Sequence, residues 1–200
     1  MLYPLISNWY GERVRSTVEV QYNEAIAKLE DESIREAFKA AQAYNESLYS
    51  VQLDPERAVD DYNSLLNLSG NGIMGYVEIP VIEVNLPIYH TVAESSLQKG
   101  AGHMPGTSLP IGGKSTHTVI SAHSGMSGAR MFTDLDKLQE GDLILLHVLG
   151  NTLAYAADTI TVTDPADIEA IEIRQDEDLV ALVTCAPYGV NTHRLLVRGH

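Results

Sequence analysis

The sequence predicts a mostly β protein, in which a closed or nearly closed β-barrel follows a helical region. Apolar residues recur every three or four positions from residue 8 to about residue 50, which is the period of an amphipathic helix. Beyond Gly70 they alternate in short runs separated by Gly- and Pro-rich turns, as in a closed or nearly closed β-barrel. We therefore expect a helical region over residues 1–69 and a barrel domain over residues 70–200.

Three helices are expected before the barrel. The apolar stripe of the first consists of Val14, Val18, Tyr22, Ile26 and Leu29. Ser33 and Glu36 form a capping box, which predicts that a second helix starts there. Its buried face would carry Ile34, Phe38, Ala41 and Leu48. Asp54 as a cap and Pro55 at the first helical position predict a third.

Short strands account for most of the remaining chain. They are expected within residues 82–88, 116–123, 142–163, 178–185 and 194–200. The segment 142–163 has the pattern of a hairpin, with Gly150-Asn151 as a two-residue type II′ turn. The nearly continuous apolar run "LVALVTC" is typical of a strand that is buried on both faces.

Net charge and the length of the apolar runs exclude several classes of protein. The 200 residues carry a formal net charge of −14, which disfavours nucleic acid and anionic membrane surfaces as direct partners. No apolar run reaches the roughly 18 residues of a membrane-spanning helix, and no signal peptide is present. Because the sequence begins and stops abruptly, we expect it to be an excised soluble part of a longer protein.

Cys185, the single cysteine, stands at the end of the buried-looking strand, and Arg194 opens the next strand. A lone cysteine is most often a small buried hydrophobic residue, and a strand-end arginine is most often a surface charge. Cys185 becomes a candidate nucleophile if an imidazole or a positive charge lies near it. If the intervening loop folds back, the ends of the two strands meet and Arg194 supplies that charge.

Seven histidines are candidates for the imidazole partner. His123 is the strongest, because it ends a second buried-looking strand and leads into the Gly-rich "SGMSG". His117 and His123 have an even spacing on a strand but lack a third metal ligand, and no HExxH motif, cysteine pair or phosphate-binding loop is present. The sequence therefore predicts neither a metal site nor a cofactor.

The stretch "LVTCAPYGVNTHRLLVRG" resembles the active-site signature of sortases, the membrane-anchored cysteine transpeptidases of Gram-positive bacteria. The upstream stretches "GYVEIPVIEVNLPIYH" and "GAGHMPGTSLPIGGKSTHTVISAHSG" also resemble the sortase barrel. "YGVNTHRLLVRG" and the long helical N-terminus are most similar to the pilus-assembling class C group. The resemblance implies a closed sortase-type barrel of about eight strands, with N-terminal helices and short connecting helices.

The same resemblance implies a function and three catalytic residues. Cys185 would attack an LPxTG-like sorting signal between Thr and Gly, and His123 would act as general acid and then as general base. Arg194 would stabilise the oxyanion or position the substrate. The thioacyl intermediate would pass to a pilin lysine amine and so polymerise pilus subunits. The enzyme would need no cofactor and would act at the extracellular face of the membrane, anchored by segments outside this sequence.

Two features depart from the class C pattern. Ala181 replaces the usual Thr that opens the TLxTC motif. Class C enzymes commonly carry Asp-Pro-aromatic in an autoinhibitory lid, whose Asp pairs with the catalytic Arg. Here the segment 50–58 contains Asp54, Pro55 and Glu56, so a lid would pair Asp54 with Arg194 but lack its aromatic plug.

Two groups of alternatives remain open at the level of the sequence. Within thiol chemistry, the chain would be a housekeeping sortase that anchors proteins to peptidoglycan, or a plain cysteine peptidase. In a different class, it would be a non-catalytic barrel that binds a surface ligand and merely buries Cys185. Replacing Cys185 with Ala should leave the function of such a binding barrel intact.

Overall fold

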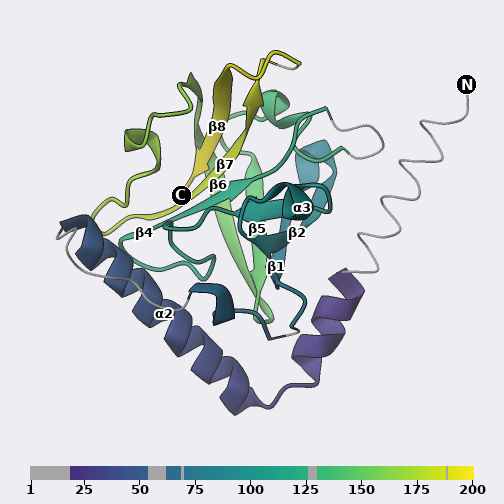
Figure 1. Ribbon diagram of the computed structural model, residues 1–200, viewed down its shortest axis with the longest axis vertical. Helices are drawn as coiled ribbons and strands as arrows, with labels where there is room; N and C mark the ends of the chain where they lie inside the picture. Colours follow the sequence, from purple (N-terminus) through teal and green to yellow (C-terminus); the bar gives the residue numbers. More distant parts are fainter. Residues whose placement is uncertain (1–18, 54–61, 69, 126–129, 188) are drawn as a thin grey trace, which may run out of the picture.

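Eight strands form a closed barrel in the computed structural model, which describes residues 19–53, 62–68, 70–125, 130–187 and 189–200 (Figure 1). Their order around the barrel is β1-β2-β3-β4-β7-β8-β6-β5. The strands are β1 (Ile73–Ile79), β2 (Val84–His90), β3 (Ala101–His103), β4 (Thr116–Ser121), β5 (Leu143–Val148), β6 (Asn151–Thr163), β7 (Asp178–Ala186) and β8 (His193–Gly199). Closure leaves no unpaired sheet edge, and it confirms the predicted fold class.

Two neighbouring pairs in this barrel are parallel, β2 with β3 and β4 with β7, whereas the other pairs are antiparallel. In a parallel pair both strands end at the same edge of the sheet. The segments that follow β4 and β7 therefore emerge side by side, at one end of the barrel. This is the feature of the fold that positions the candidate site.

The helices pack against the barrel through an apolar cluster that is separate from the main core of the barrel. Residues 19–27 are helical, and Tyr22 and Ile26 from the predicted stripe are buried there. The long helix α2 (Asp31–Leu53) buries Ala41 and Leu48 as expected. Short turns complete the connections: α3 (Glu94–Leu97), η1 (Tyr62–Ser64), η2 (Pro80–Ile82), η3 (Leu135–Lys137) and η4 (Glu169–Ile171). In the described part of the chain, no helix is long and apolar enough to cross a membrane.

The start of α2 differs from the predicted one. The helix begins at Asp31, so Ser33 lies inside its first turn instead of capping it. The carboxylates of Asp31 and Glu32 lie at the positive end of the helix dipole, which favours this earlier start. The third helix predicted from Asp54 falls mostly on residues 54–61, which lie outside the described residues.

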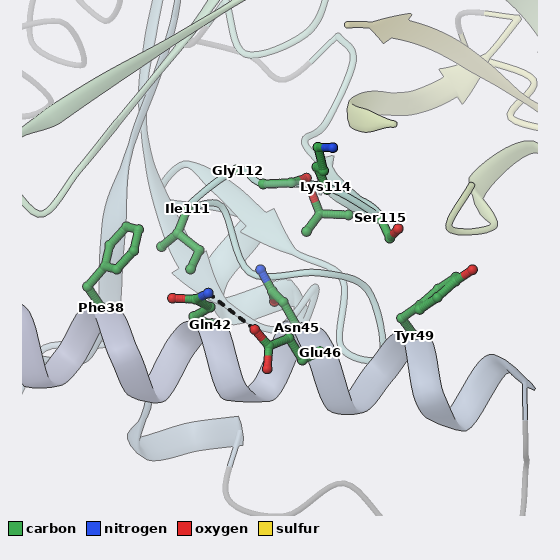
Figure 2. A pocket seen from close by; sticks show the side chains of 11 residues that line it. Phe38, Gln42, Asn45, Glu46, Tyr49, Ile111, Gly112, Lys114 and Ser115 are labelled. Carbon is green, nitrogen blue, oxygen red and sulfur yellow. Dashed lines mark hydrogen bonds between the residues drawn. The ribbon is translucent and has the colours of Figure 1, made fainter. Parts of the chain in front are cut away.

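Phe38 was expected on the buried face of the second helix, but 38% of its surface is exposed. Figure 2 shows it beside an open cavity, across from Ile111, in a gap between α2 and the loop before β4. The loop contacts the helix more closely at Asn45, whose side-chain amide exchanges two hydrogen bonds with the backbone of Leu109. The helix is therefore fixed to the loop at Asn45, about two turns beyond Phe38.

The hairpin between β5 and β6 forms as predicted, but its turn is shifted by one residue. Val148 pairs with Asn151, so the two turn residues are Leu149 and Gly150. Both have positive φ, 53° and 77°, which is the pattern of a type I′ turn instead of type II′. Leu149 is buried, and its N–H donates to the Tyr22 hydroxyl at 3.1 Å, which offsets the strain of its left-handed backbone.

Strand β7 is buried on both faces, as its apolar run predicted. One set of alternate residues, including Val180 and Leu182, belongs to the main core of the barrel. The other set, including Ala181 and Val183, packs with Val119 and Leu196 in a smaller cluster under the β6–β7 connection. Because side chains alternate along a strand, the second set continues directly to Cys185.

Candidate active site

Cys185 and Arg194 lie directly opposite one another in the antiparallel β7–β8 pair. Opposed residues on one face of such a pair have Cβ atoms about 5 Å apart, so the thiol and the guanidinium share one wall. Two main-chain carbonyls, those of Asn191 and His193, accept hydrogen bonds from Nη1 of Arg194. In the described part of the chain no carboxylate is ion-paired with Arg194, which leaves donors of its guanidinium for a ligand.

The loop that carries His123 is attached to the strand that carries Cys185. In the parallel register Ser121 pairs with Val183, so His123 reaches the level of Cys185 two residues later. The Thr184 hydroxyl donates to the Ala122 carbonyl at 2.8 Å, and the Ser124 hydroxyl donates to the Cys185 carbonyl at 3.0 Å. These bonds hold the loop against β7 on both sides of His123.

The three predicted residues line a single groove of about 350 Å³, called the Cys185 groove below. Its walls also include Ser121, Val183 and Leu196, and residues of the β6–β7 connection such as Pro165 and Ile171. Cys185 and Arg194 are half-buried, and 29% of the His123 side chain is exposed. All three side chains are therefore accessible from the groove. Cys185 and Arg194 belong to barrel strands, and His123 lies in a loop that is hydrogen-bonded to one.

His123 is the one histidine of the seven that lines this groove, and all seven are among the described residues. His103 is fully buried, which lowers its pKa to about 4. Burial also lowers the pKa of His117, whose Nδ1 contacts the Glu172 carbonyl at 2.9 Å. His147 stacks on Tyr76 in the barrel wall, as expected for a mid-strand residue. None of these three can exchange a proton with Cys185.

Together these groups can perform acyl transfer. A thiol supplies a nucleophile, an imidazole can donate and accept the proton of an amine, and a guanidinium can stabilise an oxyanion. Thr184 was expected to face away from the groove, and its buried hydroxyl does so. Ala181 lies under the β6–β7 connection in the smaller apolar cluster, on the same face of β7 as the thiol.

Sequence reasoning missed two residues of the site. The carboxylate of Glu94, in α3, lies 3.4 Å from Nε2 of His123. Ser124 bonds to the backbone of Cys185. No motif joins these residues to their partners, because each contact depends on how distant segments are brought together by the barrel.

The other sequence predictions concern residues 50–58 and metal binding. Asp54 and Glu56, the candidate lid residues, lie outside the described residues. Within the described residues, no group of three or more His, Cys, Asp or Glu side chains has the arrangement of a metal site. The cavities along α2, of about 520 and 680 Å³, contain none of the three predicted catalytic residues (Figure 2).

Comparison with known proteins identifies the family. The family model described as "Sortase domain" matches residues 77–200, which is more than half of the chain. The chain belongs to the sortase family. Sortase A of Streptococcus agalactiae serotype III (strain NEM316) is 28% identical over 116 residues, covering 56% of this chain and 47% of that protein. This sortase chain thus matches about half the length of that relative.

Solved structures that resemble this sortase include sortase C enzymes. Sortase C-1 from Streptococcus pneumoniae is 44% identical with a TM-score of 0.83, and the match covers 92% of this chain and 97% of that one. A Clostridium perfringens sortase C, solved with the C-terminal cell wall sorting motif, is 41% identical with a TM-score of 0.81 and the same coverage. Sequence and fold therefore agree on the family predicted from the motif around Cys185.

Proposed function

We propose that this sortase cleaves an LPxTG-like sorting signal between Thr and Gly and transfers the acyl group to a pilin lysine. The observation that carries the proposal is the shared groove, in which Cys185 stands opposite Arg194 and beside the tethered His123. The similarity to a sortase C solved with a cell wall sorting motif supports the substrate, and the similarity to a sortase C1 of a pilus island supports a pilin acceptor. By the same similarity, the enzyme acts at the outer face of a Gram-positive cell membrane.

The chemistry has two half-reactions. The Cys185 thiolate attacks the Thr carbonyl carbon, and the resulting oxyanion is stabilised by Arg194. The C–N bond to Gly breaks as His123 donates its proton to the leaving amine, which leaves a thioester on Cys185 and a neutral imidazole. The lysine amine then attacks this thioester and loses a proton to His123. The C–S bond breaks, an isopeptide bond forms, and the thiolate is regenerated.

The direct test is incubation of the sortase with a candidate pilin that carries a sorting signal. We expect a ladder of SDS-resistant pilin oligomers, and we expect Cys185→Ala to abolish it while its circular dichroism spectrum remains that of the parent. Cleavage without a ladder would indicate hydrolysis, and transfer only to a peptidoglycan amine would indicate the housekeeping function. Failure of a methanethiosulfonate reagent to label Cys185 would favour a non-catalytic barrel.

A further inference from the structure

Two separate cavities meet at His123. One is the Cys185 groove. The other is an open cavity of about 480 Å³ lined, among the described residues, by Glu94, Gln98, His123 and Ser124, and it is called the Glu94 pocket below. His123 is the one described residue that lines both cavities. A group bound in the Glu94 pocket would therefore contact the imidazole without entering the groove that holds the sorting signal.

The Glu94 pocket has the chemistry of a cation site. Its described lining contains one carboxylate, one amide and one hydroxyl besides the imidazole, and no Lys or Arg. Glu94 Oε2 lies 3.4 Å from Nε2 of His123, and its other oxygen accepts a hydrogen bond from the Gln98 amide at 3.1 Å. Gln98 therefore orients the carboxylate, while 67% of the Glu94 side chain stays exposed to solvent.

We propose that the Glu94 pocket binds the primary ammonium of the acceptor lysine, with Glu94 as its counter-charge. This inference rests on the proposed transfer to an amine. After the first half-reaction, the groove is filled by the acyl group on Cys185, and the neutral His123 must receive a proton from the incoming amine. A lysine held by Glu94 lies beside the base that deprotonates it. The free amine then forms the C–N bond as the C–S bond of the thioester breaks.

The position of α3 fits this role. Glu94 lies in the first turn of this short helix, and Gln98 directly follows its last residue, so the two side chains lie one turn apart. The Cys185 groove takes Leu97 from this helix, whereas the Glu94 pocket takes Glu94 and Gln98. The helix thus contributes different side chains to the two cavities, and acceptor and sorting signal contact different residues of it.

The test measures the second half-reaction alone. The thioester is first formed on Cys185 with a sorting-signal peptide, and its decay is followed by mass spectrometry at rising concentrations of nucleophile. The nucleophiles are a lysine-containing peptide, which is cationic at neutral pH, and hydroxylamine, which is uncharged there. Parent enzyme, Glu94→Gln and Glu94→Lys are compared. Glu36→Gln, which removes an exposed carboxylate from α2, is the matched control.

We expect Glu94→Gln to lower the second-order rate constant for the lysine peptide about two- to fivefold, as for an exposed ion pair. Glu94→Lys should lower it further, and Glu36→Gln should not. The rate constant for hydroxylamine should change much less than that for lysine. An equal loss for both nucleophiles would show that Glu94 acts through His123, and an unchanged lysine rate constant would show no role. Either result overturns the proposal while leaving the proposed function intact.

A different result would count against the proposed function itself. If the parent enzyme forms no thioester with the sorting-signal peptide, or if no amine attacks the thioester, both proposals fail. The two failures are therefore distinguished by the behaviour of the parent enzyme before any variant is compared.

Discussion

Thr184 connects the candidate nucleophile to the loop of its candidate base. Its buried hydroxyl donates to the carbonyl of Ala122, the residue before His123. Thr184→Val keeps the shape of the side chain but leaves that carbonyl without its donor. We expect this change to lower the free energy of unfolding by about 1–3 kcal/mol in urea titrations. The same substitution at Thr161, which is exposed on β6, should have little effect, and equal losses would contradict this account.

Arg194 should depend on its shape as well as its charge. Its guanidinium bonds to two carbonyls with one nitrogen, so the rest of the fork remains available to an oxyanion. Arg194→Lys keeps the charge but loses the planar fork, and we expect kcat/KM for sorting-signal cleavage to fall about 100-fold. Arg35→Lys on α2 is the control for the same substitution. Nearly full activity in Arg194→Lys would argue for a purely electrostatic role.

Individual site residues differed in how well they could be predicted. Position where an apolar run meets a loop made Cys185, Arg194 and His123 candidates, and the resemblance to sortases selected them. The structure brings these three predicted residues into one groove. Glu94 was missed, because its contact with His123 exists only after α3 packs beside the end of β4. A solvent-exposed carboxylate in a short helix carries no pattern that distinguishes it from the other acidic residues of this chain.

At the scale of elements, Asn45 adds two hydrogen bonds to the apolar contacts between α2 and the rest of the molecule. Its amide both donates to the Leu109 carbonyl at 3.2 Å and accepts from the Leu109 N–H at 2.7 Å, and the contact is buried. Asn45→Ala leaves this peptide group without these two partners. We expect a loss of about 2–4 kcal/mol in the free energy of unfolding, measured by urea titration. Gln42→Ala, which removes only an exposed bond to Glu46, should cost much less.

The elements themselves were predicted better than their ends. The strands of the barrel follow from alternation, but the turn of the β5–β6 hairpin does not. A rule based on local preference avoids Leu at positive φ and selects Gly150-Asn151. The protein instead places Leu149 in the turn, where it is buried and its N–H reaches Tyr22. That partner comes from the N-terminal helix, so the turn is decided by tertiary contact.

At the scale of the whole molecule, buried histidines make stability depend on pH. Burial lowers the pKa of His103 from 6.5 to about 4, and that of His117 is lowered for the same reason. Between pH 4 and pH 6.5, His103 binds a proton in the unfolded chain but not in the folded one. The stability that the neutral histidine contributes is therefore fully present above about pH 6.5 and is lost as the pH falls towards 4. For His103 the loss is at most about 3 kcal/mol.

Urea titrations between pH 4 and pH 7 test this dependence. We expect the free energy of unfolding to rise with pH across that range, and we expect His103→Gln to reduce the slope. His193→Gln, which changes an exposed histidine at the start of β8, should leave the slope unchanged. If the slope of His103→Gln equals that of the parent, His103 is not the group responsible.

The outer wall of the barrel has a consequence for how such enzymes diversify. Along β7 the inward side chains hold the barrel together, whereas the outward ones, ending at Cys185, meet the β6–β7 connection. Substitutions in the exposed part of that connection can therefore change which peptide the groove binds, while the main core of the barrel stays the same. Exchange of residues 164–169, which are exposed and of which Asp164, Pro165 and Asp167 line the groove, should transfer substrate preference between related enzymes while the melting temperature of the recipient scaffold changes little.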